Sequence, residues 1–365
     1  MMISVRREEL FKPLGAVVGV VERRHALPIL ANVLLRFDAS ELTLTATDLE
    51  AELRISLHGL SGEPGELTVP ARKLYDICRA LPVDAKLDIR LERDKAVVKS
   101  GRSRFTLTTL PASEFPSLEA AQWQDSIALS QSTLKRLLER AAFCMAQQDV
   151  RYYLNGLLLE LSSQRIRAVA TDGHRLALAE AAAEYAGSER QVIVPRKGVQ
   201  EMLRLLADDE AAVELHFGGN HIRCALPGVT LTSKLIDGRF PDYHRVIPAK
   251  HTRSVKVDRE GFREVLGRVA ILANEKYRGV RLSVVAGQLK LTAHNPEQEE
   301  AQEELSADYQ GDPLEIGFNV NYLIEAANAL AGATVDIGLT DADSSGTLRA
   351  PDDSQQLYVV MPMRL

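Results

Sequence analysis

Apolar and polar positions along the chain follow two periods, and the same order of elements comes three times. Apolar residues at helical spacing stand early in each third of the chain, at Leu10, Leu14, Val17, Val18 and Val21, at Leu134, Leu137, Leu138 and Ala141, and at Phe262, Val265, Leu266 and Val269. Such stripes predict amphipathic helices. Runs in which alternate residues are apolar, such as LTLTATD (42–48) and FTLTTL (105–110), predict strands with one buried face.

Matching segments keep one spacing, which indicates an internal repeat of about 120 residues. LTLTATDLEAEL (42–53) resembles IRAVATDGHRLAL (166–178) and, more weakly, LKLTAHNPEQEE (289–300). TVPARKLYDICRAL (68–81) matches IVPRKGVQEMLRLL (193–206), where a proline at the first turn predicts the start of a second helix. We therefore predict an α+β fold of three tandem copies of one domain, with boundaries at 1–125, 126–252 and 253–365.

Composition narrows the class of protein. The chain of 365 residues has no apolar run approaching the roughly 18 residues of a membrane helix, and its start lacks the apolar core of a signal peptide. Its three cysteines, Cys78, Cys144 and Cys224, follow neither a disulfide nor a metal-ligand spacing. We expect a cytoplasmic protein with buried thiols, no cofactor, no metal and no membrane partner.

The charge is unevenly distributed. The whole chain carries a net charge of −6, yet the four predicted helical stretches 6–24, 72–81, 132–140 and 195–206 each carry a net +2. For a single helix, charges on an exposed face are the simpler explanation. Four basic helices at equivalent places of two repeats instead favour one basic surface that contacts a polyanion through its phosphates, without reading sequence.

The segment ATDGHRLA (170–177) looks catalytic at first sight. Asp172 has an equivalent in Asp48 of the first repeat, which predicts that the aspartate shapes a turn, whereas His174 and Arg175 occur in the middle repeat alone. The other histidines form no metal-ligating set, and no nucleophile stands at a useful spacing. We expect no catalysis. A hydrolase that uses Asp172 and His174, and a protein-binding scaffold without DNA, are the alternatives.

Several strings resemble the beta subunit of bacterial DNA polymerase III, the sliding clamp family: LPILANVLL, TVPARKLYDICR, SGRSRF, QDVRYYLNG, ATDGHRLA, SKLIDGRFPDY, NPEQEEA and YVVMPMRL. The resemblance covers essentially the whole chain. It implies that two chains join head to tail into a ring, with helices lining the pore and sheets outside. Such a ring encircles double-stranded DNA and gives the replicative polymerase its processivity. The resemblance also implies an ATP-driven clamp loader that opens and closes the ring. This chain has no phosphate-binding loop of its own, so any ATP must be used by a partner.

The resemblance also implies a pocket for short Gln- and Leu/Phe-containing peptides of replicative and repair polymerases and of the loader. The matching positions are Leu154, Thr171, Gly173, His174, Arg175, Leu176, Pro241, Arg245, Val246, Asn319, Tyr322, Asp343, Ser345, Val359, Met361, Pro362, Met363 and Arg364. Core packing is the alternative for Leu176, Val246 and Val359. Asp343 departs from the family, because an apolar residue is expected there.

Two further surfaces follow from the same resemblance. Arg24, Arg72, Arg79, Gln148, Arg151, Tyr152, Tyr153, Arg196 and Lys197 match DNA-facing positions, although core or pocket-wall packing is an alternative for the two tyrosines. The acidic run NPEQEEAQEEL (295–305) and the basic strand KSGRSRFTLTTL (99–110) predict a contact between the third and first repeats of two copies. The predicted interface residues are Lys73, Arg102, Arg104, Phe105, Leu107, Ile271, Leu272, Glu297, Glu299, Glu300 and Glu303.

Overall fold

The computed structural model describes residues 1–21, 27–118 and 122–364. Arg24, a predicted DNA contact, lies outside the described residues. The chain folds into two compact units. Unit 1 comprises Met1–Ser132 and Lys197–Leu235, and unit 2 comprises Thr133–Arg196 and Ile236–Leu365. The boundaries predicted between the three repeats, at 1–125, 126–252 and 253–365, stay a prediction.

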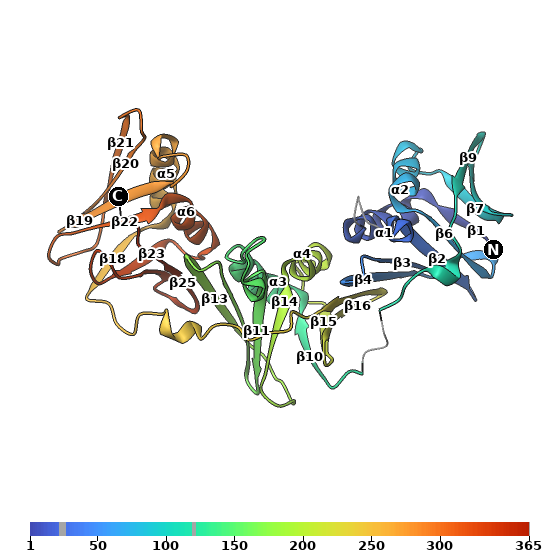
Figure 1. The fold of residues 1–365 in the computed structure, drawn as a ribbon, viewed down its shortest axis with the longest axis horizontal. Helices are drawn as coiled ribbons and strands as arrows, with labels where there is room; N and C mark the ends of the chain where they lie inside the picture. The colour runs from blue at the N-terminus through green and yellow to red at the C-terminus, as the bar shows by residue number, and fades with distance from the viewer. Residues whose placement is uncertain (22–26, 119–121, 365) are drawn as a thin grey trace. The chain divides into compact units, whose positions relative to one another are not determined.

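Unit 1 contains two antiparallel sheets (Figure 1). The five-stranded sheet has the order β5 (Ser61–Glu63), β1 (Met2–Arg6), β7 (Lys86–Glu92), β8 (Lys95–Ser100) and β9 (Ser103–Thr108). The eight-stranded sheet has the order β10 (Asp125–Ser130), β15 (Ala212–Phe217), β16 (His221–Leu226), β17 (Val229–Lys234), β4 (Ala51–Leu57), β3 (Glu41–Thr47), β2 (Asn32–Asp38) and β6 (Gly65–Pro70). Its helices are α1 (Arg7–Val20), α2 (Ala71–Ala80), all but the first residue of α4 (Arg196–Leu205), and the short η1 (Pro28–Ala31) and η2 (Ala112–Glu114).

Unit 2 repeats this plan. Its eight-stranded sheet has the order β14 (Arg190–Pro195), β11 (Gly156–Ser162), β12 (Arg165–Thr171), β13 (Arg175–Ala182), β25 (Asp353–Val360), β24 (Gly346–Ala350), β23 (Thr334–Leu339) and β18 (Arg253–Asp258). Its four-stranded sheet has the order β21 (Glu300–Ser306), β20 (Gln288–His294), β19 (Gly279–Val285) and β22 (Leu314–Asn319). The helices are α3 (Gln131–Ala142, from residue 133), α5 (Arg259–Val269), α6 (Val320–Ala329), η3 (Tyr152–Leu154), η4 (Tyr243–Arg245) and η5 (Ala270–Leu272).

Each eight-stranded sheet crosses a boundary between repeats. In unit 1, β4 of the first repeat pairs with β17 of the second, with Leu53 opposite Leu231. In unit 2, β13 of the second repeat pairs with β25 of the third, with Leu176 opposite Val359. Backbone hydrogen bonds therefore join neighbouring repeats into continuous sheets.

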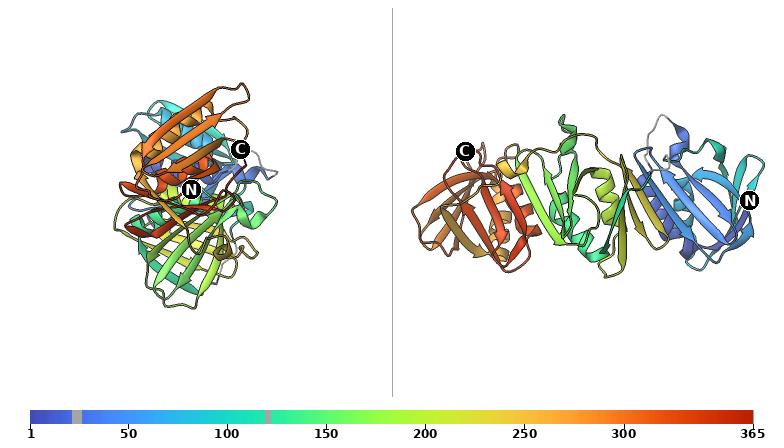
Figure 2. Two further views of the ribbon diagram at one scale, coloured as in Figure 1. Left: turned by 90° about the vertical axis from the view of Figure 1, so that its left-hand side faces the viewer. Right: turned by 90° about the horizontal axis from the view of Figure 1, so that it is seen from below.

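The helical stripes read from the sequence form the core. Leu10, Leu14 and Val17 of α1 are fully buried, and α1 packs beside α2. The last buried residue of α1 is Val20 rather than the expected Val21, because the helix ends there and Val21 adopts an extended backbone. The strands of the first repeat face the viewer when the molecule is seen from below (Figure 2, right).

All three cysteines are free and buried, as expected. Burial raises the pKa of the Cys78 thiol to about 11, although Arg7 opposes the shift, and raises that of Cys224 to about 12. Both thiols are therefore protonated and unreactive at neutral pH. No helix within the described ranges is both long and apolar enough to span a membrane.

Candidate functional site

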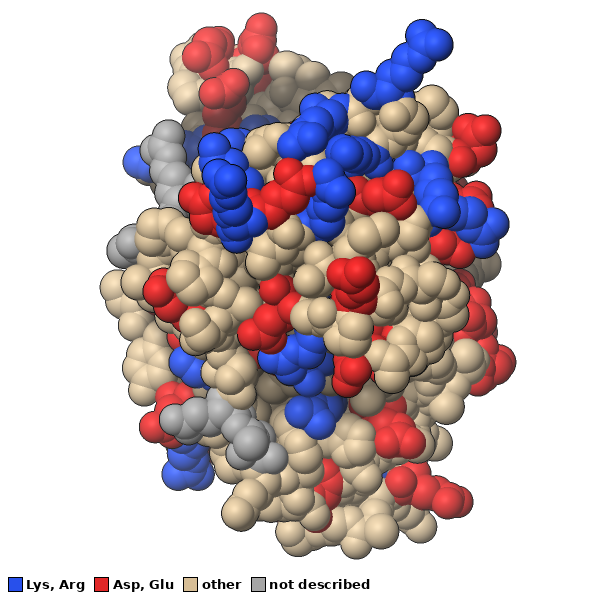
Figure 3. Space-filling model, turned by 90° about the vertical axis from the view of Figure 1, so that its right-hand side faces the viewer, with Lys and Arg blue, Asp and Glu red and all other residues tan. Residues whose placement is uncertain are grey.

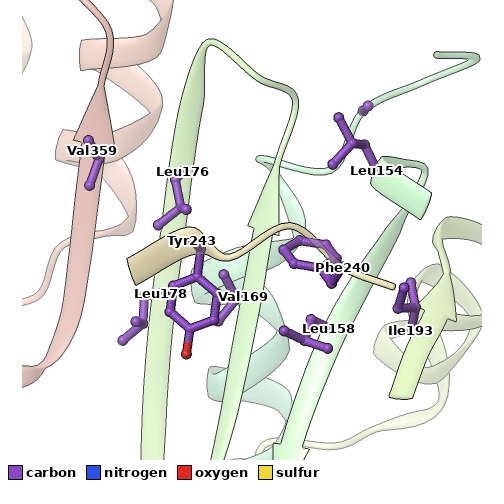
Figure 4. Close-up of a cluster of buried hydrophobic side chains, with 10 residues drawn as sticks. Leu154, Leu158, Val169, Leu176, Leu178, Ile193, Phe240, Tyr243 and Val359 are labelled. Carbon is purple, nitrogen blue, oxygen red and sulfur yellow. The ribbon is translucent and has the colours of Figure 1, made fainter. Parts of the chain in front are cut away.

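A cluster of buried apolar side chains in unit 2 contains three of the predicted pocket residues (Figure 4). Leu154, Leu176 and Val359 come from three separate elements, and each is at most 2% exposed. The other members are Ala146, Leu158, Val169, Leu178, Ile193, Phe240 and Tyr243. Such burial suits the floor of a pocket and, for Leu176 and Val359, also the core-packing alternative, so the pocket role of these three residues stays a prediction.

Phe240 and Tyr243, which cover this cluster, were missed in the sequence, although Pro241, Arg245 and Val246 of the same segment were predicted pocket residues. Phe240 is 8% exposed and Tyr243 is 3% exposed, and both lie over the β11–β13 strands (Figure 4). The Tyr243 hydroxyl donates to Glu160 Oε2 at 2.5 Å and accepts from Arg167 Nη1 at 2.8 Å. Burial and the hydrogen bond to Glu160 raise the pKa of Tyr243 to about 12, against the opposing effect of Arg167. These bonds fix the covering segment to the sheet. The Phe–Pro pair at 240–241, which recurs at 115–116, was the available signal.

The turn after β12 is held by its own side chains. Asp172 Oδ1 accepts hydrogen bonds from the backbone amides of His174 and Arg175, at 2.9 and 3.0 Å. Thr171 Oγ1 accepts from the amide of Gly173 at 3.1 Å, and Gly173 has a φ of +88°, which favours glycine. The prediction that Asp172 shapes a turn is confirmed. Its carboxylate positions the backbone of His174.

Asp48 makes the same turn in the first repeat. Its Oδ1 accepts from the amides of Glu50 and Ala51 at 2.9 and 2.7 Å. Its Oδ2 pairs with the ammonium of Lys197 from α4 in the second repeat, and Lys197 also donates to the carbonyl of Val20 at 3.0 Å. Lys197 was predicted to face DNA. In the structure it links two repeats.

Arg175 makes the corresponding link between the second and third repeats. Its side chain is 10% exposed, and its guanidinium pairs with Asp172 and with Glu325 of α6. The guanidinium also donates to the Phe143 carbonyl at 2.9 Å and lies 4.5 Å above the Tyr322 ring. Of these partners, Tyr322 was itself a predicted pocket residue. Glu325 of the third repeat and the Phe143 carbonyl of the second were missed, because contacts between segments distant in the sequence leave no periodic signal.

The C-terminal segment lies beside the turn. The Met361 amide donates to the His174 carbonyl at 2.9 Å, and Ser345 Oγ lies 3.0 Å from Met361 Sδ. Met361 and Val246 remain 42% and 41% exposed. The structure therefore gathers predicted residues from the second and third repeats around an apolar rim, and the exposure of Val246 argues against the core-packing alternative for that residue.

Charged side chains flank this rim. Arg245 is exposed and pairs with Asp242 at 3.0 Å. Asp343 and Arg364 lie 3.9 Å apart at the surface, so the departure noted at Asp343 places a carboxylate near a predicted pocket arginine. Of the other predicted residues, Pro241 is exposed, Pro362 and Met363 are half-buried, and Asn319 Oδ1 caps α6 by accepting from the Asn321 amide at 3.0 Å.

Family models match the chain along nearly its whole length. The N-terminal, central and C-terminal domains of the DNA polymerase III beta subunit match residues 1–119, 128–242 and 244–364. The chain belongs to this family. The resemblance and the fold of three tandem clamp domains read from the sequence are confirmed.

Relatives and solved structures agree. The chain is 54% identical over 368 residues to the beta sliding clamp of Pseudomonas putida and 48% identical over 367 residues to that of Escherichia coli, with both chains fully covered in each case. A crystal structure of the DNA polymerase III subunit beta from Pseudomonas aeruginosa matches with a TM-score of 0.96 and 51% identity, again over the whole of both chains.

The residues at DNA-facing family positions have different surroundings. Arg72 and Arg79 of α2 are exposed, and Arg79 pairs with Asp76 at 2.9 Å. Arg196 is half-buried and donates to the Met145 carbonyl at 3.0 Å. Among these positions, Arg72 thus offers an accessible charge.

The loop before η3 carries the remaining predicted DNA contacts. Gln148 is exposed with a φ of +55°. Arg151 pairs with Asp149 at 2.9 Å and donates to the Asp172 carbonyl at 3.3 Å, so this loop contacts the turn beside the cluster. Tyr152 is 57% exposed, and Tyr153 is half-buried against the cluster. Tyr153 therefore has the pocket-wall surroundings of the alternative, and Tyr152 does not.

The residues at the family's interface positions lie at two sheet edges. β9 ends the five-stranded sheet and carries Arg104, Phe105 and Leu107, while β21 ends the four-stranded sheet. Ile271 of η5, which contacts β21, is 76% exposed. Figure 3 views unit 1 from the side of β7 and β9 in Figure 1, and Lys and Arg side chains gather across the upper part of this face.

The remaining interface residues carry opposite charges on the two edges. Lys73 and Arg102 are exposed in unit 1, and Glu297, Glu299 and Glu300 are exposed in unit 2. Arg104 pairs with Glu92 at 3.0 Å and Glu303 pairs with Arg268 at 2.7 Å, while Leu272 is half-buried.

Proposed function

We propose that this chain is a non-catalytic DNA sliding clamp. Two copies join head to tail into a ring that encloses duplex DNA and tethers the replicative polymerase during bacterial replication in the cytoplasm. Family membership along the whole chain supports the role in replication. The observation that carries the ring is the pattern of paired and unpaired sheet edges.

The internal junctions provide the template for ring closure. At each, the strand after the Asp turn (β4 or β13) pairs antiparallel with the last strand of the next repeat (β17 or β25). The equivalents left over are β21 in the third repeat and β9 in the first, and both lie at sheet edges. Pairing β21 of one copy with β9 of another makes a third junction of the same kind. Such a head-to-tail contact gives a closed dimer when the rotation closes after two copies.

Charge and apolar surface support this contact. The β9 edge carries Arg102 and Arg104, and the β21 edge carries Glu297, Glu299 and Glu300. Opposite charges favour β9 against β21 and disfavour each edge against itself. Ile271, which is 76% exposed beside β21, gains a buried environment in the dimer.

The apolar cluster and its rim are the proposed docking site for the clamp loader and for replicative and repair polymerases, through their short peptides. The site combines a buried floor with the exposed Met361, a flexible side chain that adapts to different partners. A solved relative from Pseudomonas aeruginosa is described as bound to griselimycin. The hydrolase alternative predicts turnover that His174→Ala abolishes. The clamp predicts lost peptide binding instead.

Retention on circular DNA tests the ring. The protein is loaded onto nicked circles by a bacterial clamp loader with ATP, then washed at high salt. We expect it to stay on the circles and to leave once they are linearised, because a closed ring is linked topologically and not by salt-sensitive contacts. Loss from intact circles after competent loading would refute the ring and favour the scaffold alternative. Arg72→Glu separates the two further, since a scaffold needs no DNA-facing charge.

A further inference from the structure

A groove beside the four-stranded sheet of the third repeat is lined mostly by residues that the proposed function described so far does not use. It is a hollow of about 400 Å³ beside the four-stranded sheet, lined by Asn274, Tyr277, Arg281, Thr292, His294 and Met363, among others. We propose that this groove binds an aromatic side chain, flanked by acidic residues, from the same partner segment that anchors in the apolar cluster. The inference rests on the proposed peptide docking.

The repeats identify the groove. Tyr277, Arg281 and Thr292 each stand 123 residues after a member of the apolar cluster, respectively Leu154, Leu158 and Val169. The groove and the cluster therefore occupy equivalent places on successive repeats.

A phenylalanine of the chain fills the equivalent place in the second repeat, and one lines an open hollow at the equivalent place in the first. In the second repeat, Phe240 packs with Leu158 in the buried cluster. In the first, Phe115 lines a hollow together with Leu34, which stands 124 residues before Leu158. Both phenylalanines precede a proline in the segment that follows the last strand of the repeat.

The third repeat does not fill its own groove with any described residue. The Met363 amide donates to the Gly317 carbonyl at 2.9 Å, just as the Ile236 amide donates to the Ile193 carbonyl at 2.9 Å in the second repeat. Met363 is thus equivalent to Ile236, four residues before Phe240.

The walls indicate what fits. The Tyr277 ring is 57% exposed and offers a face for stacking. The rim is cationic, because Arg281 and Arg364 have exposed side chains and Lys276 Nζ lies 5.1 Å from the centre of the Tyr277 ring. Glu315, 3.4 Å from Arg281, and Asp343, 3.9 Å from Arg364, offset two of these three positive charges. An aromatic residue with acidic neighbours complements these walls.

The groove is continuous with the peptide site. Met363 and Arg364 are predicted pocket residues and also line the groove. Asn319, another predicted pocket residue, donates from Nδ2 to the Tyr277 carbonyl at 3.4 Å. A peptide anchored in the cluster can therefore continue into the groove, and the two contacts on one chain reinforce each other.

Fluorescence anisotropy with the full protein tests this inference. The probes are a short Gln- and Leu/Phe-containing anchor peptide, and the same peptide extended at either end by Asp-Asp-Phe, Asp-Asp-Ser or Lys-Lys-Phe. We expect the Asp-Asp-Phe extension at one end to tighten binding about tenfold over the anchor alone, because it adds one buried ring and two charge contacts. Replacing either the ring or the acids should remove most of that gain.

Substitutions at two exposed positions show whether the added affinity comes from the groove. Tyr277→Ala should abolish the advantage of Phe over Ser, and Arg281→Glu should abolish the advantage of Asp over Lys, with anchor binding unchanged. Arg165→Glu is the matched control, because Arg165 is also an exposed strand arginine paired with a glutamate, Glu180. Equal affinity for the anchor and every extension would refute binding in the groove and leave the proposed peptide docking intact. Failure of the anchor peptide to bind would overturn the proposed peptide docking itself.

Discussion

Replacing Lys197 by methionine distinguishes the structural role of this residue from the DNA contact predicted for it. The Asp48 side chain is 3% exposed and pairs with the Lys197 ammonium. Lys197→Met keeps the length of the side chain and leaves the Asp48 carboxylate without its cation. We therefore expect unit 1 to lose stability without any DNA present.

The magnitude follows from burial and from the bonds that remain. Breaking a fully buried ion pair costs about 3–5 kcal/mol. Lys197 is 33% exposed, and Asp48 keeps two backbone hydrogen bonds, so part of that cost is offset. We expect a loss of about 1.5–3 kcal/mol. For a unit of this size, each kcal/mol lowers the melting temperature by about 2–4 °C.

Arg72→Met is the control, because Arg72 stands 125 residues earlier at the equivalent helix position and is exposed. Urea denaturation followed by circular dichroism should give an unchanged free energy of unfolding for this variant. Adding Asp48→Asn to Lys197→Met should restore part of the loss, since the carboxylate charge is then gone. If Lys197→Met and Arg72→Met are equally stable, and both weaken DNA association to the same extent, Lys197 is a DNA contact and the structural argument is wrong.

Three further outcomes follow from the same structure. Phe240→Ala should lower the free energy of unfolding by about 3 kcal/mol, because a large buried ring is lost, and should also weaken binding of the anchor peptide. An unchanged peptide affinity would show that the covering segment takes no part in peptide binding. Burial and the nearby Arg349 lower the pKa of His251 below its usual 6.5, so His251 contributes stability that is full above pH 6.5 and falls as the pH drops towards the folded-state pKa. Between pH 7.5 and pH 5, the melting temperature of His251→Gln should therefore fall less than that of the parent chain. An equal fall in both proteins would contradict this. Ile271→Asp should give monomers in sedimentation at a concentration where the parent chain is dimeric, with an unchanged melting temperature for unit 2; a variant dimer would exclude Ile271 from the contact.

Patterns with a short period were predicted well from the sequence. The helical stripe Leu10, Leu14, Val17 is buried as expected, and the Asp48 and Asp172 turns follow from residue type and repetition. Each depends on interactions within a few residues of the chain, and the repeat supplies an internal control. The family was also identifiable, since its characteristic strings are spread through all three repeats.

Contacts between distant segments were not predictable in this way. Lys197 and Arg72 occupy equivalent helix positions, yet only Lys197 meets a buried carboxylate, because β4 pairs with β17 and brings two repeats together. Glu325 pairs with Arg175 through the corresponding junction. The partner of a charged side chain in this fold depends on which strand edges meet, and that information is absent from any local pattern.

The sheet that crosses from the first repeat into the second predicts that the covalent connection between them is not needed to hold them together. Five residue pairs of β4 and β17 face each other across that boundary, and Lys197 adds its contact with Asp48. A protease nick between η2 and β10 should therefore leave unit 1 assembled and copurifying as two fragments. The same two fragments, expressed separately, would each expose an unpaired strand and should reconstitute only when mixed. In this sense, hydrogen bonding between strand edges determines which repeats are neighbours more than the peptide connection between them does.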